Sequence, residues 1–509
     1  MDTVKQPLIV INRNDTVAVA LGDYSKGSEF AVNGEAIRLV DDIPFGHKVA
    51  LKDIAEGENI LKYGAPIGHA SAPILKGAHV HTHNVKTNLA DVLDYAYSPA
   101  RGALEAFARD AEHVKAMGYT FEGYPRPGGR AGTRNEVWII PLVGCVNNTA
   151  DNLAAEAREK FGSRCDGVFA YTHNMGCSQL GDDMLTTQKI LAGIINNPNA
   201  GGVLVLGLGC ENNHLEVFRP VLEALGPIDE DRVKFLVTQD VEDEIEEGLA
   251  ILDQLTAHAA KSRRTRIPVS ALTIGFKCGG SDAFSGITAN ALCGVVNDTL
   301  VKAGGSTILT EVPEMFGAET LLMERAVDEA TFEATVALIN DYKHYFTRYG
   351  QVIYENPSPG NKKGGITTLE EKSLGCTQKG GAAPVVGVLG YGEAVAKKGL
   401  NLLTGSGNDQ VSCTNLVASG ATMILFTTGR GNPFGAPVPT VKIASNDRLY
   451  ERKKNWIDFN AGQILTDGME KTAETFFRYL LDVASGKQFT LNEIHGYRDI
   501  SVFRDGVIL

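Results

Sequence analysis

The sequence is poor in cysteine, with 8 cysteines among 509 residues and no Cys-x-x-Cys pair. That low density excludes a disulfide-built scaffold and predicts free thiols in a reducing compartment, the cytoplasm. Long apolar runs are also missing, because segments such as 137–143 and 202–208 are far shorter than the roughly 20 residues of a membrane span. The first residues carry no charged and apolar leader, so we expect neither a secretory signal nor a membrane partner.

Positive charge is scarce as well. The chain has 48 Lys and Arg against 61 Asp and Glu, and its net charge of −13 argues against a nucleic-acid partner. Nucleotide fingerprints are absent: the G-x-G-x-x-G pattern fails at 207–212, where Asn212 takes the last position, and there is no G-x-x-x-x-G-K-[ST] loop. We therefore expect no nucleotide cofactor.

The composition that remains is that of a globular protein, with 43% apolar and 21% charged residues. A chain of this length predicts two or three domains. Residues 1–100 show short alternating strands broken by glycine, which predict a small all-β domain. Residues 101–130 predict a linker with one helix at 103–118, because the segment ends in the Pro/Gly-rich YPRPGGRAG.

From residue 131 the pattern becomes α/β. Continuous apolar strands at 137–146, 167–173 and 201–210 alternate with helical segments, which is typical of a parallel sheet covered on both faces. The basic stretch 261–266 marks a junction, and the same strand-to-glycine pattern then restarts. We therefore expect two α/β catalytic domains with mainly parallel sheets, at 131–265 and 266–509.

Three histidines alternate in GAHVHTHN: His79, His81 and His83. On a strand they would project from one face, where neutral imidazoles suit a divalent metal. His47 could join them from a neighbouring strand. A polar, solvated strand face is the alternative interpretation.

A second group follows predicted strands, at the sheet edge where ligands of open α/β folds bind. This group contains Cys145, His173, Cys177, Cys210, Glu211 and Cys278. Thiolates bind soft or borderline metals, and three cysteines could hold an iron–sulfur cluster. The missing Cys-x-x-Cys pair weakens the cluster hypothesis, and each cysteine could also be a small apolar core residue.

Glycine-rich loops offer backbone N–H groups, hydroxyls and cations for a carboxylate. The candidate substrate-binding residues on them are Ser281, Asp282, Asn356, Ser358, Asn361, Lys362 and Arg430. The planar fork of an arginine suits a carboxylate, and Lys363 adds charge nearby. Ordinary tight turns are the alternative for each loop taken alone.

Two glutamates, Glu311 and Glu314, follow another predicted strand in TEVPEMFGAE. Carboxylates in this position could ligate a metal or transfer protons, although charged residues at strand ends are usually just solvated. We take Glu311 as a catalytic candidate.

Taken together, several segments resemble the altronate/galactarate dehydratase family across essentially the whole chain. They are GHKVALKDIAEGENILKYGAPIG, HVHTHN, GLGCENN, CGGSDAFSGITAN, EVPEMFGAE, ENPSPGNKKGGITTLEEKSLGCTQKGG and TTGRGNPFG. Within the family, HVHTHNVKTNL, CSQLGDD and EVPEMFGAE resemble the altronate branch. The galactarate branch differs at the histidine segment, so those histidines could tune the site instead of holding the metal alone.

The resemblance implies an N-terminal β-clip domain of the antifreeze-like type, followed by a two-part α/β catalytic region. It implies a divalent metal, Fe2+ with Mn2+ as a substitute, and a homodimer. The implied reaction dehydrates D-altronate to 2-dehydro-3-deoxy-D-gluconate in hexuronate (galacturonate) catabolism. Removal of the C2 proton needs a base, for which His173 and Lys372 are candidates.

Three alternatives stay open. Galactarate dehydration and a sulfolactate-type lyase reaction would use the same elimination apparatus with other side pockets. A sugar-acid-binding protein without turnover would use the same fold, and formation of any keto-deoxy acid would exclude it.

Overall fold

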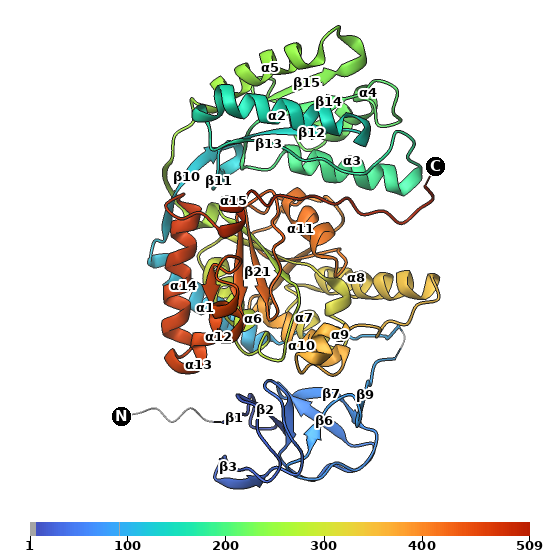
Figure 1. The fold of residues 1–509 in the computed structure, drawn as a ribbon, viewed down its shortest axis with the longest axis vertical. Helices are drawn as coiled ribbons and strands as arrows, with labels where there is room; N and C mark the ends of the chain where they lie inside the picture. The colour runs from blue at the N-terminus through green and yellow to red at the C-terminus, as the bar shows by residue number, and fades with distance from the viewer. Residues whose placement is uncertain (1–6, 91, 509) are drawn as a thin grey trace.

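The computed structural model describes residues 7–90 and 92–508. The chain forms three units stacked along its long axis (Figure 1), with a β-rich unit at one end and two α/β units beyond it. The described N-terminal residues begin in the β-rich unit, and the chain ends beside the α/β unit farthest from it.

The N-terminal unit is built from short antiparallel strands, which confirms the expected all-β domain. One sheet has the order β1-β2-β5-β8, a second is the β3-β4 hairpin, and a third has the order β6-β7-β9. The strands are β1 (Leu8–Ile9), β2 (Val17–Ala20), β3 (Glu29–Val32), β4 (Glu35–Arg38), β5 (Lys48–Ala50), β6 (Asn59–Lys62), β7 (Ala65–Ala70), β8 (His79–Val80) and β9 (Val85–Lys86). Buried isoleucines such as Ile54, Ile60 and Ile67 fill the space between the sheets.

The segment expected to be a linker contains more structure than predicted. Its helix, α1 (Arg101–Ala116), is present, but the Pro/Gly-rich part forms a hairpin of β10 (Thr120–Arg126) and β11 (Arg130–Gly132). Gly128 and Gly129 adopt positive φ and make the tight turn. β16 (Thr265–Pro268), from the basic junction, pairs with the other edge of β10. The linker expectation was wrong here because a distant strand supplies the pairing partner.

The first α/β unit is a four-stranded parallel sheet of order β13-β12-β14-β15. Its strands are β12 (Glu136–Pro141), β13 (Val168–Ala170), β14 (Ala200–Gly207) and β15 (Val233–Val237). Val137 and Ile139 face α2 (Asn147–Phe161) and α5 (Glu244–Ala259), and Trp138 and Ile140 face the opposite side. That side is covered by α3 (Gly181–Ile195) and α4 (Leu215–Glu223).

The second α/β unit is a seven-stranded parallel sheet of order β19-β20-β18-β17-β21-β22-β23. Its strands are β17 (Thr273–Cys278), β18 (Ser306–Leu309), β19 (Val385–Leu389), β20 (Gly399–Leu403), β21 (Met423–Thr428), β22 (Thr440–Ala444) and β23 (Phe459–Asn460). Its helices are α6 (Ala289–Lys302), α7 (Thr320–Met323), α8 (Glu329–Arg348), α9 (Pro359–Lys363), α10 (Leu369–Thr377), α11 (Asp409–Ala418), α12 (Asp447–Arg452), α13 (Ile464–Asp467), α14 (Met469–Ala484) and α15 (Leu491–His495). The two parallel sheets confirm the α/β prediction.

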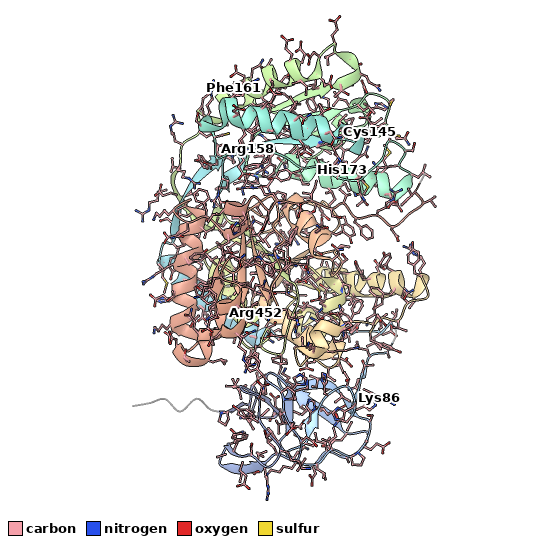
Figure 2. The ribbon with its side chains drawn as sticks, viewed as in Figure 1. Lys86, Cys145, Arg158, Phe161, His173 and Arg452 are labelled. Atoms are coloured by element: carbon pink, nitrogen blue, oxygen red, sulfur yellow. The ribbon has the colours of Figure 1, made fainter. Side chains whose placement is uncertain are left out.

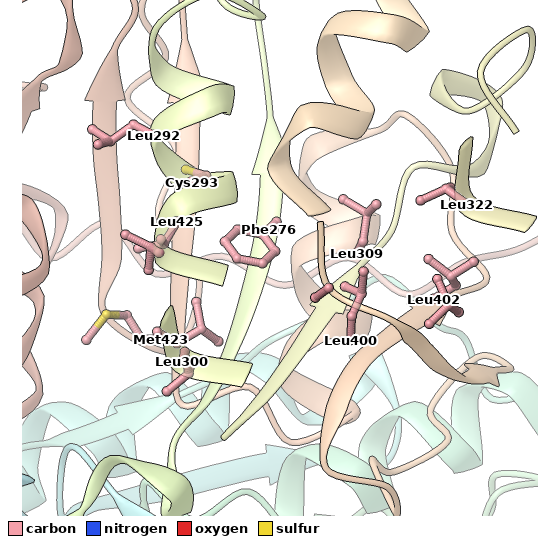
Figure 3. Close-up of a cluster of buried hydrophobic side chains, with 14 of the residues drawn as sticks. Phe276, Leu292, Cys293, Leu300, Leu309, Leu322, Leu400, Leu402, Met423 and Leu425 are labelled. Atoms are coloured by element: carbon pink, nitrogen blue, oxygen red, sulfur yellow. The ribbon is translucent and has the colours of Figure 1, made fainter. Parts of the chain in front are cut away.

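Figure 3 shows part of the apolar cluster on one face of the seven-stranded sheet, to which Phe276, Leu309 and Leu425 of the strands and Leu292 and Leu300 of α6 belong. On the other face α11 packs against α3, so one apolar layer joins the two α/β units. The loop after β17 meets the N-terminal unit, where Phe284 and Val19 share a small apolar cluster. The carboxyl edge of this sheet therefore lies next to the β-rich unit. None of the described helices is long and apolar enough to cross a membrane.

Candidate active site at the carboxyl edge of the seven-stranded sheet

A buried group of charges occupies the carboxyl edge of the seven-stranded sheet. Lys277 is the next-to-last residue of β17, Glu311 and Glu314 follow β18, and Lys372 and Lys379 come from α10 and the turn after it. All five side chains are buried. Buried charges are rare unless they are paired, and sets that perturb one another's protonation occur preferentially at functional sites.

Glu311 holds two of these lysines together. One carboxylate oxygen accepts from the Nζ of Lys277, and the other accepts from the Nζ of Lys379 at 2.6 Å. The backbone of Glu311 lies in the left-handed region at φ 72°, which costs free energy for a residue with a Cβ. Such a conformation persists when its surroundings impose it, and here it directs the carboxylate between the two ammonium groups.

Glu314 makes the second ion pair. Lys372 donates from Nζ to Oε1 of Glu314 at 2.8 Å and to Oδ1 of Asn356 at 3.0 Å. Burial would raise the pKa of Glu314, but the ammonium groups of Lys372, Lys277 and Lys379 outweigh it and hold that pKa well below its usual range. Burial would likewise lower the pKa of Lys372, but the Glu314 carboxylate raises it overall. Lys372 is thus a protonated acid at neutral pH.

Two thiols lie beside the same carboxylate. Cys376 donates to Oε2 of Glu314 at 2.9 Å, Cys278 approaches that oxygen at 3.1 Å, and the two sulfurs are 3.3 Å apart. The hydrogen bond with Cys278, together with burial, raises the pKa of Cys376. Within the described residues, Cys278, Glu314 and Cys376 are the one trio of metal-ligand types whose ligand atoms all lie within 4.8 Å of one another.

The predicted histidines gather at the nearby surface of the N-terminal unit. β8 ends at Val80, so His81 and His83 lie on a turn and not on one strand face as expected. Asn84 makes this turn, because its side chain accepts from His81 N and donates to His79 O. The rings nevertheless converge, with ring centroids 5.3–5.6 Å apart for His79 with His83 and His81.

His47 completes this histidine group, as the sequence predicted. Its Nδ1 is 2.9 Å from Nε2 of His79, and its ring centroid is 4.8 Å from that of His81. Burial lowers the pKa of all three, to about 4 for His79 and about 3 for His81, with neighbouring cationic groups acting in the same direction. Neutral imidazoles at physiological pH retain the lone pairs that bind metals.

A buried ion triad joins the histidine group to the lysine–carboxylate group. Lys48 and Lys62 both donate to Glu371 of α10, with each shortest contact at 2.8 Å. α10 presents Glu371 to the N-terminal unit, and its next residue, Lys372, pairs with Glu314. A cavity of about 10 Å³, the space of roughly one water, lies here. Its lining includes Lys62, Ser281, Asp282, Lys372 and Cys376.

The glycine-rich loops predicted to bind substrate meet above this cavity. Asn361 donates to the carbonyl of Ser281 at 2.8 Å and accepts from the hydroxyl of Ser358 at 2.8 Å. Asp282 accepts from Ser445, Asn446 and the backbone of Ser285. The Asp282 carboxylate is therefore occupied in shaping its own loop, whereas Asn356 is held by Lys372 as described above.

Two cations on these loops remain available. Arg430 is exposed, and a Cβ built on Gly360 would lie 3.9 Å from its Nε, so it lies over the start of α9. Lys362 is half-buried on α9 itself. Among the described residues neither side chain forms an ion pair, so both can meet a substrate anion.

Four predicted residues lie elsewhere, in the first α/β unit. His173, Cys177, Cys210 and Glu211 all follow strands of the four-stranded sheet, and Figure 2 shows His173 in that unit beside Cys145. Both ring nitrogens of His173 are engaged: Nε2 lies 2.8 Å from Pro141 O, and Nδ1 accepts from Met175 N. This position favours a structural role for His173 over the role of general base.

Several members of the buried site were not predicted from the sequence. They are Lys48, Lys62, Lys277, Glu371, Cys376 and Lys379. Lys277 lies at the end of the apolar strand β17, directly before Cys278, so the strand-end signal that marks the cysteine marks the lysine as well. For Lys48, Lys62 and Glu371 the partners lie on different domains, more than 300 residues apart, so no local pattern could reveal the pairing.

Lysines paired with carboxylates are buried at the carboxyl edge of the sheet, next to Arg430 and Lys362, which form no ion pair among the described residues. This arrangement is typical of an enzyme that transfers protons on an anionic substrate. Sequence comparison supplies the family. Residues 269–508 match the D-galactarate/altronate dehydratase C-terminal model, 123–260 match the D-galactarate dehydratase/altronate hydrolase second domain, and 6–88 match the altronate/galactarate dehydratase SAF domain. The chain belongs to the galactarate/altronate dehydratase family, and it is a hydro-lyase that dehydrates sugar acids.

Individual relatives match over nearly the whole chain. The altronate dehydratase of Bacillus subtilis (strain 168) is 50% identical over 98% of this chain and 99% of its own length. The altronate dehydratase of Escherichia coli (strain K12) is 49% identical over 98% and 99%. The galactarate dehydratase (L-threo-forming) of Escherichia coli is 34% identical over 97% and 96%. These findings confirm the family that the sequence motifs resemble.

Proposed function

We propose that the substrate is D-altronate and the products are 2-dehydro-3-deoxy-D-gluconate and water, in hexuronate catabolism. The higher identity to the two altronate dehydratases than to the galactarate enzyme supports this choice. The observation that carries the site is the placement of Arg430 and Lys362, without counter-ions, on the loops that cover the Lys372–Glu314 pair.

The reaction makes two demands on the protein. The C2 proton lies beside a carboxylate, so its removal builds negative charge on that carboxylate and on C2. The hydroxide leaving C3 is a poor leaving group and needs a proton or an electrophile. A site for this reaction therefore requires cations around the carboxylate and an acid near C3.

Arg430 and Lys362 meet the first demand. A guanidinium can grip the substrate carboxylate with two parallel hydrogen bonds, and Lys362 adds a second positive charge from α9. The N–H groups and hydroxyls of the 281 and 358 loops can donate to substrate hydroxyls. Because carboxylate charge grows as the C2 proton leaves, this clamp binds the transition state more tightly than the ground state.

Lys372 meets the second demand. Its raised pKa keeps the amine protonated at neutral pH, so we assign it the role of proton donor to the departing hydroxide. This replaces the base role considered from the sequence, because an amine that already carries its proton cannot accept another. Glu314 and Glu311 hold the lysines in place and balance their charge, and as the carboxylates of the same buried group we assign them the proton that leaves C2.

Three histidines of the N-terminal unit suit the divalent metal that the family implies. His47, His79 and His81 are neutral, mutually close and partly exposed, and they fit a divalent iron, with manganese as a substitute. His83 and the Cys278–Glu314–Cys376 trio belong to the wider pool of candidate ligands. When bound, such an ion supplies Lewis-acid stabilisation of the developing enediolate.

All eight cysteines are free, which supports a reducing compartment, the cytoplasm.

The experiment is a substrate panel combined with one clamp variant. Purified protein loaded anaerobically with ferrous iron should convert D-altronate faster than galactarate, sulfolactate (which would lose sulfite instead of water) or altronate diastereomers. Arg430→Ala should reduce kcat/KM by roughly a hundredfold or more, and Arg430→Lys should also impair it, since the charge survives but the fork does not. Arg478→Ala, which removes an exposed arginine paired only with Glu474, is the matched control.

Faster conversion of another acid in the panel would show that altronate is not the preferred substrate, but it would not contradict the proposed site. Normal kinetics in a folded, iron-loaded Arg430→Ala would remove the clamp from the proposal.

A further inference from the structure

The exposed cysteines of this protein all lie at one place. Cys145, Cys177 and Cys210 are exposed, whereas the other five are buried or half-buried. They follow β12, β13 and β14, which are neighbours in the four-stranded sheet. Figure 2 shows Cys145 at one end of that unit, with Phe161 toward the opposite end. Exposed free thiols are open to oxidation, so the presence of three on adjacent loops suggests that they bind a ligand.

Hydrogen bonds join every pair of the three cysteine loops. Gly144 N donates to Met175 O at 2.7 Å, which ties the Cys145 loop to the Cys177 loop. Asn212 N donates to Cys177 O at 2.8 Å, which ties the Cys177 loop to the Cys210 loop. Asn213 Nδ2 donates to Leu142 O at 3.3 Å and closes the ring.

The loops are also shaped to stay close. A Cβ on Gly144 would lie 2.9 Å from His173 O, so only glycine permits this approach. The buried carboxylate of Glu211 accepts from Leu208 N at 2.9 Å and from Gly209 N at 2.7 Å, which fixes the turn that presents Cys210. Gln239 donates from Nε2 to the Cys210 sulfur at 3.6 Å, a contact that stabilises a thiolate.

We propose that Cys145, Cys177 and Cys210 bind an iron–sulfur cluster of the four-iron type, with three irons held by the protein and the fourth open to a small oxygen ligand. This site is separate from the buried site under the N-terminal unit. The proposal stands on the cysteine loops alone and does not depend on the substrate proposed above.

Spacing favours a cluster over a single ion. Three thiolates on one zinc ion would lie about 3.8 Å apart, given Zn–S bonds of about 2.3 Å in tetrahedral geometry. Among the described residues, however, the only trio with all ligand atoms within 4.8 Å is Cys278, Glu314 and Cys376. The three exposed sulfurs are therefore not gathered within 4.8 Å of one another as a single ion would gather them, and a cluster, which binds each thiolate on a different iron, accepts sulfurs set farther apart.

The two nearest described candidates for a fourth protein ligand, His173 and Glu211, are already engaged, and the surroundings favour negative charge. Both ring nitrogens of His173 and both carboxylate oxygens of Glu211 are occupied by backbone groups. A four-iron cluster with one open iron needs only three protein ligands. The helices α2, α3 and α4 begin just after the cysteines, at Asn147, Gly181 and Leu215, and helix N-termini stabilise thiolates and anionic clusters.

The test measures metal and sulfide, not activity. Full-length protein is reconstituted anaerobically with ferrous iron and sulfide, desalted, and assayed for both elements, for visible absorption and for the paramagnetic signal after reduction. We expect about four sulfides per chain in the wild type. The triple variant Cys145→Ser/Cys177→Ser/Cys210→Ser should retain no sulfide. Because the histidine group binds no sulfide, iron bound there cannot imitate the result.

Cys165→Ser is the matched control, because this half-buried thiol bonds only to the nearby carbonyl of Gly167. It should keep the full sulfide content and the signal of the reduced cluster. Circular dichroism should show that the triple variant is folded, since all three substituted side chains are exposed. A wild type that takes up no sulfide, or a folded triple variant that takes up as much as the wild type, would overturn the proposal.

Discussion

At the scale of single residues, Lys372 is the side chain whose protonation the proposed chemistry uses most directly. Lys372→Gln removes the proton donor while leaving a group that can still bond to Asn356. We expect kcat to fall by roughly a hundredfold to ten-thousandfold, with a smaller change in KM, because the donor acts mainly on the leaving hydroxide. Steady-state kinetics with D-altronate would measure this.

The matched control for Lys372 is Lys471→Gln, which removes an exposed lysine from the surface of α14. Its kinetics should equal those of the wild type. If Lys372→Gln raises KM but leaves kcat unchanged, Lys372 positions the substrate and does not donate the proton.

Lys442 is a buried amine that the proposed reaction leaves unused. Its Nζ has no hydrogen-bond partner among the described residues and lies 3.5 Å from the centre of the Phe426 ring. Burial lowers the pKa of Lys442 to about 7. Between pH 7 and its ordinary value of 10.5 the unfolded chain binds more protons than the folded chain, so the free energy of unfolding rises with pH in that window.

Lys442→Met should therefore stabilise the protein, because it keeps the volume and removes the buried charge. We expect a gain of roughly 1–3 kcal/mol at about pH 6, shrinking as the pH rises to about 10. Urea denaturation at both pH values would measure it. A variant less stable than the wild type at both would show that the contact between the amine and Phe426 outweighs burial.

At the scale of elements, α10 is the helix that joins the N-terminal unit to the site. Glu371 on α10 is the shared partner of Lys48 and Lys62, and all three side chains are at most 1% exposed. Glu371→Gln would leave two buried ammonium groups without their anion. Breaking a buried ion pair in this way costs roughly 3–5 kcal/mol, which we expect as a loss in the free energy of unfolding.

The control for Glu371 is Glu58→Gln, which breaks an exposed pair with Lys52 and should cost about 0–1 kcal/mol. Acid gives a second readout. The pKa of Glu371 is lowered to about 2, because Lys48 and Lys62 outweigh the opposing effect of burial. Its contribution is therefore complete above pH 4.5 and is lost as the pH falls toward 2. Equal acid sensitivity of the wild type and Glu371→Gln would argue against this assignment.

Elements with strong periodicity could be predicted from the sequence, and those defined by distant partners could not. The apolar strands β12 and β14 were recognised because a parallel sheet buries both faces of a strand. β10 was missed because one of its two partners, β16, lies some 140 residues away, and because the Pro/Gly-rich turn to the other, β11, was interpreted as a linker. The histidine segment was predicted as a strand because alternation does not show where Asn84 turns the chain.

The same division holds for the candidate site. The loop residues around Asn361 and Arg430 could be found because glycine, serine and basic residues cluster locally. The pairing of Lys277 and Lys379 through Glu311 could not, because three separate segments supply the charges. The family could be recognised from the sequence, because a series of motifs in the same order identifies it without any knowledge of the contacts in the structure.

At the scale of the whole molecule, we expect a homodimer, on the family resemblance and on the prevalence of two-fold assemblies. Light scattering coupled to size-exclusion chromatography should give about twice the 54.5 kDa of one chain. The measurement should be repeated at the protein concentration of the kinetic assay. A mass of one chain there would contradict the prediction and show that a single copy is sufficient for activity.

The ion triad between α10 and the N-terminal unit has a consequence for how this enzyme can be encoded. Its attraction is non-covalent, it is shielded from water, and it joins residues 48 and 62 directly to residue 371. Peptide continuity is therefore not the only link between the β-rich unit and the rest of the chain. The same architecture could be encoded by two genes, one for the β-rich unit and one for the α/β units. The buried ion pairs would then contribute to specific association of the two polypeptides.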